Sequence, residues 1–447
     1  MIKIYDTMTR SLRDFVPLTE NVVNMYVCGP TVYNYIHIGN ARSAVAFDTI
    51  RRYFEYCGYT VNYISNFTDV DDKIIKAANE AGISTKELSD KFIAAFMEDT
   101  GQLGIKPATQ NPRVINYMDE IIAFVSTLVD KGFAYVSEGD VYFRVAKSNN
   151  YAKLANKTLE DLEIGASGRT DAETERKENP LDFALWKAAK EGEVSWDSPW
   201  GPGRPGWHIE CSVMATEILG DTIDIHGGGA DLEFPHHTNE IAQSEAKTGK
   251  TFANYWMHNG FVNVDNEKMS KSLGNFVTVH DMLKTVDGQV LRFFLATQQY
   301  RKPINFTEKA IHDAEVNLKY LKNTYSLPLT DQMNQDELQT YLEAFQTAMD
   351  DDFNTANGVT VLFDMAKWIN SGNYDQTVKD AFEKMLQVFG IVFEEEVLDE
   401  DIEKLIEERQ AARANKDFAT ADRIRDELAA QGIKLLDTKE GVRWTRD

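Results

Sequence analysis

The 447-residue sequence contains few cysteines and no long apolar segment. Its three cysteines, Cys28, Cys57 and Cys211, are too few for a disulfide framework, which fits a reducing compartment and leaves packing or metal binding as their uses. No apolar run approaches the roughly 18 residues that a membrane span requires. The first residues have neither the apolar core of an export signal nor the basic, serine-rich character of an organelle signal. We therefore expect a cytoplasmic protein with no membrane partner.

Basic residues are scarce relative to acidic ones. The 47 Lys and Arg against 71 Asp and Glu give a net charge of −24, which argues against a general nucleic-acid-binding protein because phosphate contacts are made by clustered Lys and Arg. Almost all of the negative net charge lies before residue 401, since residues 401–447 hold 10 Lys and Arg against 11 Asp and Glu. A local nucleic-acid contact in this last segment is therefore compatible with the charge.

Residues 206–243 concentrate chemically active side chains. They include a thiol (Cys211), three histidines (His226, His236 and His237) and the carboxylate of Glu240. Zinc accepts sulfur, imidazole nitrogen and carboxylate oxygen, usually four of them. His236 and Glu240 are four apart in a predicted helix and would share a face, and Cys211 could join them across a pair of strands. One ligand is missing from the segment, and a capped helix whose histidines only form hydrogen bonds is the alternative.

The N-terminal region has the pattern of a strand, a loop, a helix and a second strand. A β-rich run at residues 21–28 precedes a Gly-Pro turn, and apolar residues recur at helical spacing over residues 44–54. This predicts the start of a parallel βαβ unit, which binds ligands beyond the carboxyl ends of its strands. The loop places His37, Gly39 and Asn40 at a helix N-terminus, where N–H groups and the helix dipole favour phosphate. A glycine before a helix can also be only a turn.

A second candidate phosphate contact lies in the stretch DNEKMSKSLGNFVT. Lys268 and Lys271 flank two serines in a predicted polar loop, with Gly274 as a hinge. Two lysines in a mobile loop suit the charge that develops on a triphosphate during its cleavage. The alternative is a pair of solvated lysines on a turn.

These motifs together carry a family resemblance. His37-Ile38-Gly39-Asn40 resembles the HIGH motif of class I aminoacyl-tRNA synthetases, and residues 268–272 read KMSKS. CGPTVYNYIHIGNAR, FTDVDDKI, GRPGWHIECS, HGGGADLEFPHHTNEIAQ and KMSKSLGN, in this order, resemble cysteinyl-tRNA synthetases over essentially the whole chain. The departure is Asn40, where the HIGH motif has its second histidine. Its amide can still donate hydrogen bonds to phosphate oxygens.

The resemblance implies a set of site residues. The zinc ligands, for one ion per chain, would be Cys28, Cys211, His236 and Glu240, and the metal would bind the sulfur of the substrate cysteine. The ATP phosphates, with Mg²⁺, would be bound at His37, Gly39, Asn40, Lys268 and Lys271. The catalytic residues, which stabilise charge on the phosphates, would be His37, Asn40, Lys268 and Lys271. The cysteine pocket would be formed by Thr68, Trp207 and Asp231, although core packing is an alternative role for Trp207.

The resemblance also implies an α/β fold with several domains. We expect a Rossmann-like class I synthetase catalytic domain at 1–270 with an insertion at about 126–200, a KMSKS loop and stem-contact region at 271–312, an α-helical bundle at 313–397 and a small anticodon-binding unit at 398–447. Helical spacing marks residues 308–325, 335–349, 355–370, 376–389, 401–415 and 418–431, followed by a hairpin around 439–441. Arg443 and Trp444 in that hairpin are suited to anticodon contacts, or they only close the small domain.

The expected function is a monomeric cysteine–tRNA ligase whose partners are L-cysteine, ATP and tRNA(Cys). The cysteine carboxylate would attack the α-phosphate of ATP, and the terminal ribose hydroxyl of tRNA would then attack the acyl carbon. Two alternatives stay open. One is a ligase that joins cysteine to an amino-sugar inositol and would lack the anticodon-reading unit, and the other is a non-catalytic, zinc-stabilised RNA-binding protein.

Overall fold

A computed structural model describes residues 1–166, 174–270, 272–331, 335–394, 400–439 and 441–446. The chain divides into two compact units. The first comprises Met1–Ala314, Glu343–Val361 and Gln387–Ile391, and the second Glu315–Leu342, Leu362–Leu386 and Val392–Asp447. Among the described residues no helix has the length and apolar character needed to cross a bilayer.

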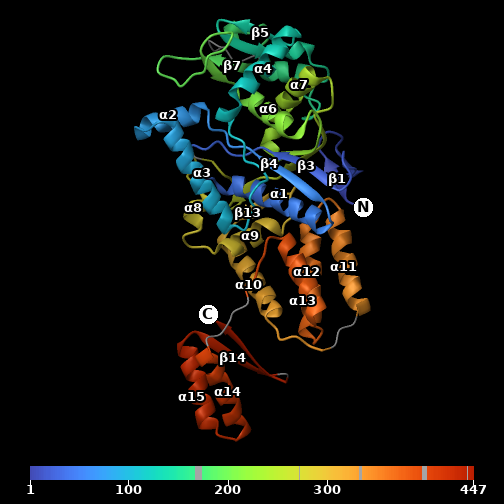
Figure 1. The fold of residues 1–447 in the computed structure, drawn as a ribbon, viewed down its shortest axis with the longest axis vertical. Helices are drawn as coiled ribbons and strands as arrows, with labels where there is room; N and C mark the ends of the chain where they lie inside the picture. Colours follow the sequence, from blue (N-terminus) through green and yellow to red (C-terminus); the bar gives the residue numbers. More distant parts are fainter. Residues whose placement is uncertain (167–173, 271, 332–334, 395–399, 440, 447) are drawn as a thin grey trace. The chain divides into compact units, whose positions relative to one another are not determined.

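The first unit is built around a parallel sheet with the strand order β10-β9-β3-β4. β3 (Val22–Val27), α1 (Ile38–Tyr56) and β4 (Thr60–Ser65) form the βαβ unit predicted from the sequence, which is confirmed (Figure 1). β9 (Ile223–Gly229) lies on the other side of β3 and is followed by β10 (Ala253–Asn259). The strand order therefore reverses between β3 and β9, and a ligand crevice forms at such a point beyond the carboxyl ends of the strands.

Helix α1 packs closely on the sheet because β9 ends in glycines. A Cβ atom at Gly227 would lie 2.4 Å from Cε1 of Phe47, a fully buried residue of α1. The absence of a side chain at this position thus lets the ring rest on the strand backbone. This contact fixes α1 over the end of β9, where the functional side chains begin.

A second, antiparallel sheet is inserted into the first unit. It has the order β5-β6-β7-β8 and consists of β5 (Ala134–Ser137), β6 (Asp140–Phe143), β7 (Phe183–Ala188) and β8 (Gly203–Pro205). β5 and β6 form an antiparallel hairpin, and Figure 1 shows this sheet beside α4 and α7. The remaining elements of this part of the chain are β1 (Lys3–Asp6), β2 (Ser11–Asp14), α2 (Asp72–Ala81), α3 (Thr85–Gln102), α4 (Met118–Asp130), α5 (Leu159–Ala166), α6 (Trp207–Leu219), α7 (Thr238–Thr248), β11 (Val262–Val264), β12 (Glu267–Lys268), α8 (Val279–Met282), α9 (Gly288–Ala296) and β13 (Ile304–Phe306).

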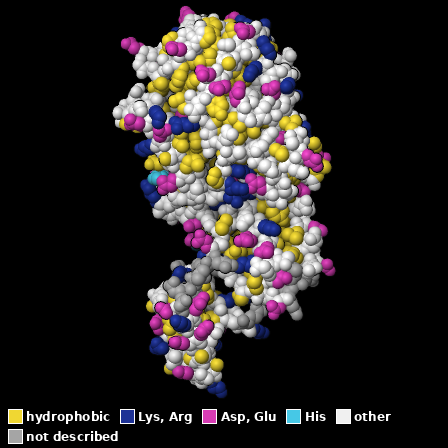
Figure 2. Space-filling model, in the orientation of Figure 1, with side chains coloured by type: hydrophobic (Ala, Val, Ile, Leu, Met, Phe, Trp, Pro, Cys, Tyr) yellow, Lys and Arg dark blue, Asp and Glu magenta, His cyan; other side chains and the backbone are white. Residues whose placement is uncertain are grey.

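The helices predicted in the C-terminal part are confirmed, with bounds within one residue of the expected ones. They are α10 (Glu308–Tyr325), α11 (Gln335–Asp350), α12 (Thr355–Asn370), α13 (Gln376–Val388), α14 (Glu400–Ala414) and α15 (Phe418–Ala430), and the hairpin follows as β14 (Ile433–Thr438) and β15 (Gly441–Arg446). Acidic and basic side chains are interspersed over the face of the molecule shown in Figure 2.

The small core of the last helices and hairpin lies in the second unit. Ile402, Ile424, Leu428 and Ile433 are buried together. At its edge Arg409 donates two hydrogen bonds, each of 2.8 Å, to the two carboxylate oxygens of Asp437. This forked pair ties α14 to β14 in one orientation.

A buried ion pair joins α9 to α1 within the first unit. Arg292 is fully buried and donates from Nη1 to Oδ2 of Asp48 at 2.7 Å and from Nε to the carbonyl of Phe389 at 2.8 Å. Asp48 also accepts from Nε of Arg52 at 2.8 Å. Burial alone would raise the pKa of Asp48, but Arg292 and Arg52 bring it below its usual value. The carboxylate is therefore charged inside the protein and depends on these partners.

Replacing Arg292 tests this dependence. Arg292→Met should lower the free energy of unfolding of the first unit by about 3–5 kcal/mol, because a buried charge loses its partner. Chemical denaturation followed by the fluorescence of buried Trp186 and Trp256 would measure the change. The control is Lys309→Met, which removes an exposed pair with Asp313 and should have no measurable effect. Equal effects of the two substitutions would contradict this account.

Candidate active site and metal centre

A cavity of about 660 Å³ opens at the carboxyl ends of the central strands. It brings together residues that the sequence analysis singled out from distant parts of the chain. Its lining includes Cys28, His37, Gly39, Asn40, Trp207, Asp231 and Lys268. Thr68 is not among the lining residues, and Lys271 lies outside the described residues.

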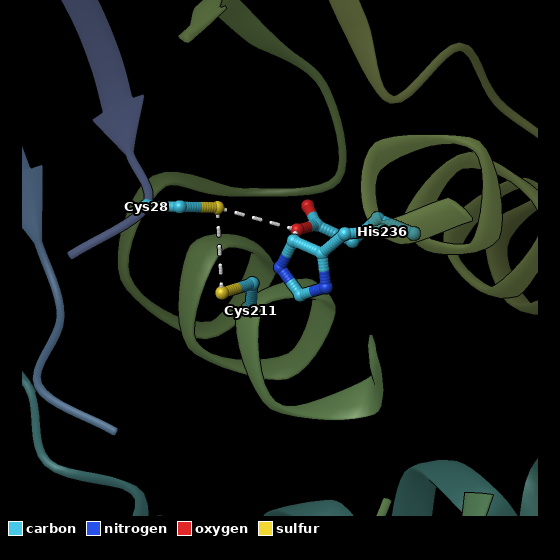
Figure 3. Close-up of side chains that lie close together, drawn as sticks. Cys28, Cys211 and His236 are labelled. Atoms are coloured by element: carbon cyan, nitrogen blue, oxygen red, sulfur yellow. Dashed lines mark hydrogen bonds and ion pairs between the residues drawn. The ribbon is translucent and has the colours of Figure 1, made fainter. Parts of the chain in front are cut away.

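Two thiols meet at the base of this region (Figure 3). Cys28 follows the last residue of β3, and its Sγ lies 3.6 Å from Sγ of Cys211. Cys211 was expected to join His236 and Glu240 across a pair of strands, which is wrong, because Cys211 belongs to helix α6. This helix begins after Gly206 and is buried from Ile209 to Thr216. Its sequence therefore lacks the alternating polar and apolar faces by which a surface helix is recognised.

His236 and Glu240 complete a group of four ligand atoms. His236 belongs to a single helical turn, η5 (Glu233–His237), and Glu240 lies in the following helix α7. The predicted proximity of these two residues is confirmed, since His236 Nε2 lies 2.9 Å from Glu240 Oε1. Glu240 Oε1 in turn accepts from Sγ of Cys28 at 3.4 Å. The ligand atoms of Cys28, Cys211, His236 and Glu240 all lie within 4.8 Å of one another.

A second group of four shares two of these residues. Cys28, His226, His237 and Glu240 also place their ligand atoms within 4.8 Å of one another. His226 Nε2 lies 2.5 Å from Glu240 Oε2, and His237 Nε2 lies 3.4 Å from Sγ of Cys28. The buried Glu240 therefore contacts a histidine of each group, His236 through Oε1 and His226 through Oε2.

The outer nitrogens of the three histidines have different partners. Nδ1 of His236 lies 3.0 Å from Nδ1 of His208, and Nδ1 of His237 lies 2.8 Å from Nε2 of His258. Nδ1 of His226 is buried and has no hydrogen-bond partner among the described residues. Because a ligating histidine usually gives its other ring N–H to an acceptor, His236 and His237 are better held than His226.

Burial and mutual contact shift the pKa values of the cluster in opposite directions. Burial raises the pKa of Cys28, whereas the hydrogen bond from Cys28 lowers the pKa of Cys211 to about 6. Burial would also raise the pKa of Glu240, but His226 and His236 hold it well below its usual value. Cys211 and Glu240 are therefore predisposed to the anionic form that binds a metal.

In the first group the distances from Cys28 match those between the ligands of a zinc ion, whereas His236 Nε2 and Glu240 Oε1, 2.9 Å apart, are at hydrogen-bond distance. In a tetrahedral site with Zn–S of about 2.3 Å and Zn–O of about 2.1 Å, two sulfurs lie about 3.8 Å apart and a sulfur and an oxygen about 3.6 Å apart. The observed separations are 3.6 Å for the two sulfurs and 3.4 Å for Cys28 Sγ to Glu240 Oε1. Two thiols, an imidazole and a carboxylate are also donors that zinc accepts.

The other end of the cavity is formed by the N-terminus of α1. His37 is the N-cap, its Nδ1 accepts from the backbone N–H of Asn40 at 3.2 Å, and Asn40 Oδ1 accepts from the backbone N–H of His37 at 3.2 Å. The carbonyl of the Asn40 side chain is thus used in the cap, so only its amide nitrogen can donate to a phosphate. A Cβ atom at Gly39 would lie 2.8 Å from Cε1 of His37, so this capped geometry leaves no room for a side chain.

Lys268 lines the cavity from the end of the short strand β12. The loop that follows is bonded mainly to itself, since Asn275 accepts from the backbone N–H of Ser270 at 2.8 Å and donates to the carbonyl of Lys268 at 3.2 Å. Lys268, which was predicted in a polar loop, thus reaches the same cavity as His37 from the end of β12.

The three predicted contacts of the amino acid lie in different environments. Trp207 is 42% exposed, faces the cavity and stacks on His236 with ring centroids 4.2 Å apart. Asp231 also lines the cavity. Thr68 is buried, and its Oγ1 accepts from Nδ2 of Asn66 at 3.3 Å. The structure thus places Trp207 beside the cluster of Cys28, Cys211, His236 and Glu240, and Thr68 outside the cavity lining.

The outer layer of the cluster was not predicted from the sequence. His208 and His258 contact two of the central histidines, and Thr7 Oγ1 lies 2.7 Å from Nδ1 of His258. The signal in the sequence was the crowding of five of the eight histidines between residues 208 and 258. Thr7 gave no signal, because the first strand meets this site only through tertiary contacts.

Arg443 and Trp444 lie in β15 and so face opposite sides of the two-stranded ribbon. Trp444 is opposite Leu435 and packs against the small core. Arg443 is opposite Leu436, which is 58% exposed. The two side chains are therefore not presented together to one ligand.

Comparison with known families gives three matches along the chain. The catalytic domain of "tRNA synthetases class I (C)" matches residues 14–316, a DALR domain matches residues 344–394, and a cysteinyl-tRNA ligase anticodon binding domain matches residues 395–444.

Relatives and solved structures agree with these matches. The cysteine–tRNA ligases of Streptococcus thermophilus and Streptococcus agalactiae are 94% and 82% identical to the chain over 447 residues, which is 100% of both proteins in each case. Methionyl-tRNA synthetase from Mycobacterium tuberculosis, in complex with methionyl-adenylate, has the same fold with a TM-score of 0.60 at 15% identity, over 82% of this chain and 89% of that one. The class I catalytic domain, the anticodon-binding domain and the full-length relatives together show that the chain belongs to the cysteine–tRNA ligase family of class I aminoacyl-tRNA synthetases.

Proposed function

We propose that this protein attaches L-cysteine to tRNA(Cys) with ATP, and that it selects cysteine through a zinc ion held by Cys28, Cys211, His236 and Glu240. The observation that carries the proposal is the buried cluster of two thiols, an imidazole and a carboxylate at a cavity that also contains the N-terminus of α1. One end of this cavity suits a thiol substrate and the other suits phosphate.

Three features favour this ligand set over the one with His226 and His237. It contains both thiols, and thiolates are the donors that zinc retains most selectively. Its histidine has an outer partner, His208, whereas His226 has none among the residues described. Trp207 stacks on His236 and is exposed to the cavity, so this side of the cluster is the one that a substrate reaches.

Zinc in this position would supply a strong preference for a thiolate over a hydroxyl. A site that requires a specific substrate atom can reject an analogue that lacks it by about 10⁴-fold or more, which makes a separate editing step unnecessary. Trp207 would wall the side-chain pocket, and Asp231 would pair with the ammonium group of the substrate. Thr68 would act from behind the wall by fixing the loop that contains Gly29 and Pro30, since its backbone N–H donates to the carbonyl of Pro30 at 3.1 Å.

In the first displacement an oxygen of the cysteine carboxylate attacks the α-phosphorus of ATP. The bond between the α-phosphorus and the bridging oxygen breaks, and pyrophosphate leaves with Mg²⁺. His37, the amide nitrogen of Asn40, Lys268 and Lys271 would stabilise the charge on the phosphates, with Gly39 allowing close approach. This is catalysis by position and electrostatics, without a protein nucleophile.

In the second displacement the terminal ribose hydroxyl of tRNA attacks the acyl carbon, and AMP leaves. We assign residues 271–312 to contacts with the acceptor stem, 313–397 to the helical support and 398–447 to the anticodon. Arg443 is the better candidate for a base contact because it lies on the outer face of its ribbon, while the ring of Trp444 supports the core.

The two alternative functions each lack support. A ligase for an amino-sugar inositol would need no anticodon-binding domain, yet one matches residues 395–444. A non-catalytic RNA-binding protein would need neither the capped N-terminus of α1 at a cavity nor a lysine beside it, and both are present.

Charging of tRNA tests the proposal directly. Purified protein with ATP and Mg²⁺ should attach labelled cysteine to unfractionated tRNA, and labelled serine should be attached at least about 10⁴-fold less efficiently. A zinc chelator should abolish the reaction after prolonged incubation. Adenylate formation without transfer to tRNA would instead support the small-molecule ligase, and the absence of any adenylate would support the binding protein.

The metal assignment predicts a contrast between two cysteines. Cys211→Ser should remove zinc and lower cysteine-dependent pyrophosphate exchange by more than about 100-fold, because losing a ligand should exceed the 10–100-fold cost of losing an outer partner. Cys57→Ser is the matched control, since Cys57 is exposed at the end of α1, and it should retain both. Metal content and pyrophosphate exchange would be measured on the same samples. Full zinc content in the Cys211→Ser protein would refute the assignment.

A further inference from the structure

Three side chains beside the nucleotide end of the cavity form a contact between distant segments. Tyr35 precedes α1, His280 belongs to α8 and Asp99 belongs to α3. The rings of Tyr35 and His280 stack with centroids 4.1 Å apart and planes inclined by 12°. His280 Nδ1 lies 3.2 Å from Asp99 Oδ1, and Tyr35 also meets Phe92 of α3 edge-on at 5.2 Å. We refer to Tyr35, His280 and Asp99 as the anchor triad.

The backbone makes the same connection. The N–H of Ile38 donates to the carbonyl of Val277 at 3.1 Å, and the N–H of Val279 donates to the carbonyl of Ile36 at 3.0 Å. Between these bonds His37 and Thr278 form an antiparallel bridge. The segment after the KMSKS loop is therefore paired, residue by residue, with the segment that holds the capping histidine of α1.

The KMSKS loop, residues 268–275, has other hydrogen-bond partners than the segment at 277–279 that follows it. The side-chain hydrogen bonds described for it run between Lys268, Ser270, Ser272, Leu273 and Asn275. Its first residue, Lys268, also ends β12 and is paired with Asn263 of β11. The ring of Phe276, at the boundary, meets His37 at 5.2 Å. The loop is thus fixed upstream by the pairing of β12 with β11 and downstream by the stacked and hydrogen-bonded contact, and Asn275 links its downstream half to Ser270 and Lys268.

Burial of Asp99 indicates that the contact serves more than packing. Asp99 is 1% exposed, and its Oδ2 has no hydrogen-bond partner among the described residues. Burial raises its pKa, although His280 opposes that shift. A buried carboxylate with one oxygen unsatisfied lowers stability, so its hydrogen bond to His280 is the compensating interaction in this part of the fold.

We propose that the anchor triad positions the KMSKS loop for the activation step, holding its downstream end on the segment before α1 so that Lys268 and His37 reach the same triphosphate. This inference rests on the proposed function. Tyr35, His280 and Asp99 act through the loop and are positioning residues rather than catalytic ones. Because a misplacement of about 1 Å can lower a rate by about 100-fold, loss of the anchor should be visible in ATP kinetics.

The test is cysteine-dependent pyrophosphate exchange by His280→Ala. We expect kcat/KM for ATP to fall by about 10–100-fold, while KM for cysteine, zinc content and single-turnover transfer from enzyme-bound adenylate to tRNA stay within twofold. His312→Ala is the matched control, since His312 is an exposed histidine of α10, and it should change nothing.

Further variants separate the anchor from general destabilisation. Tyr35→Phe keeps the stacking ring and should retain activity, whereas Tyr35→Ala should resemble His280→Ala, and the double substitution should add little because the two residues act together. His280→Gln can donate to Asp99 and should recover part of the loss. These expectations hold even if His280→Ala folds poorly, because Tyr35→Phe and His280→Gln are conservative.

Two results would overturn the inference. One is unchanged ATP kinetics in His280→Ala, and the other is an equal loss for ATP, cysteine and transfer, which indicates a structural role alone. Either is distinct from failure of the proposed function, in which the unaltered protein would show no cysteine-dependent pyrophosphate exchange at all.

Discussion

The buried carboxylate of Glu240 is the interaction on which the site depends. It is fully buried, and its two oxygens contact Cys28, His226 and His236, which lie just after β3, in β9 and in the turn before α7. A buried charge without such partners would cost several kcal/mol. The parallel sheet, the glycines that end β9 and the two helices α6 and α7 therefore have to meet at one point. The same arrangement that satisfies Glu240 brings two thiols within reach of one metal ion.

The crevice at the carboxyl ends of the parallel sheet can bind a thiol and a triphosphate side by side. The carboxyl end of β3 leads directly to Cys28, and the chain then returns through the loop before α1 to the helix N-terminus that favours phosphate. A thiol and a triphosphate can thus be bound a short distance apart on one continuous segment. The buried pair of Arg292 with Asp48 holds the far side of α1 in place, so the helix N-terminus keeps its position over the cavity.

Much of the fold could be predicted from the sequence, because helical spacing in α10 to α15 and the strand–helix–strand pattern around α1 are local signals. The site could be predicted only in part. His236 and Glu240 are four residues apart, so their contact follows from helix geometry, but Cys28 lies 183 residues from Cys211 and entered the ligand set only through the family resemblance. Cys211 was expected to reach the site across a pair of strands, and its helix was not predicted because α6 is buried on most sides and lacks a polar stripe. His208 and His258 are brought to the cluster by tertiary packing, which no local pattern encodes.

X-ray absorption spectroscopy at the zinc edge tests the central claim most directly, because it counts the sulfur atoms bound to the metal. The account predicts two sulfur neighbours per zinc in the protein alone, from Cys28 and Cys211, and three when cysteine is added, with no change on addition of serine. One sulfur in the protein alone would show that the ion sits instead with His226 and His237. A sulfur count that does not rise with cysteine would contradict the claim that the metal selects the substrate.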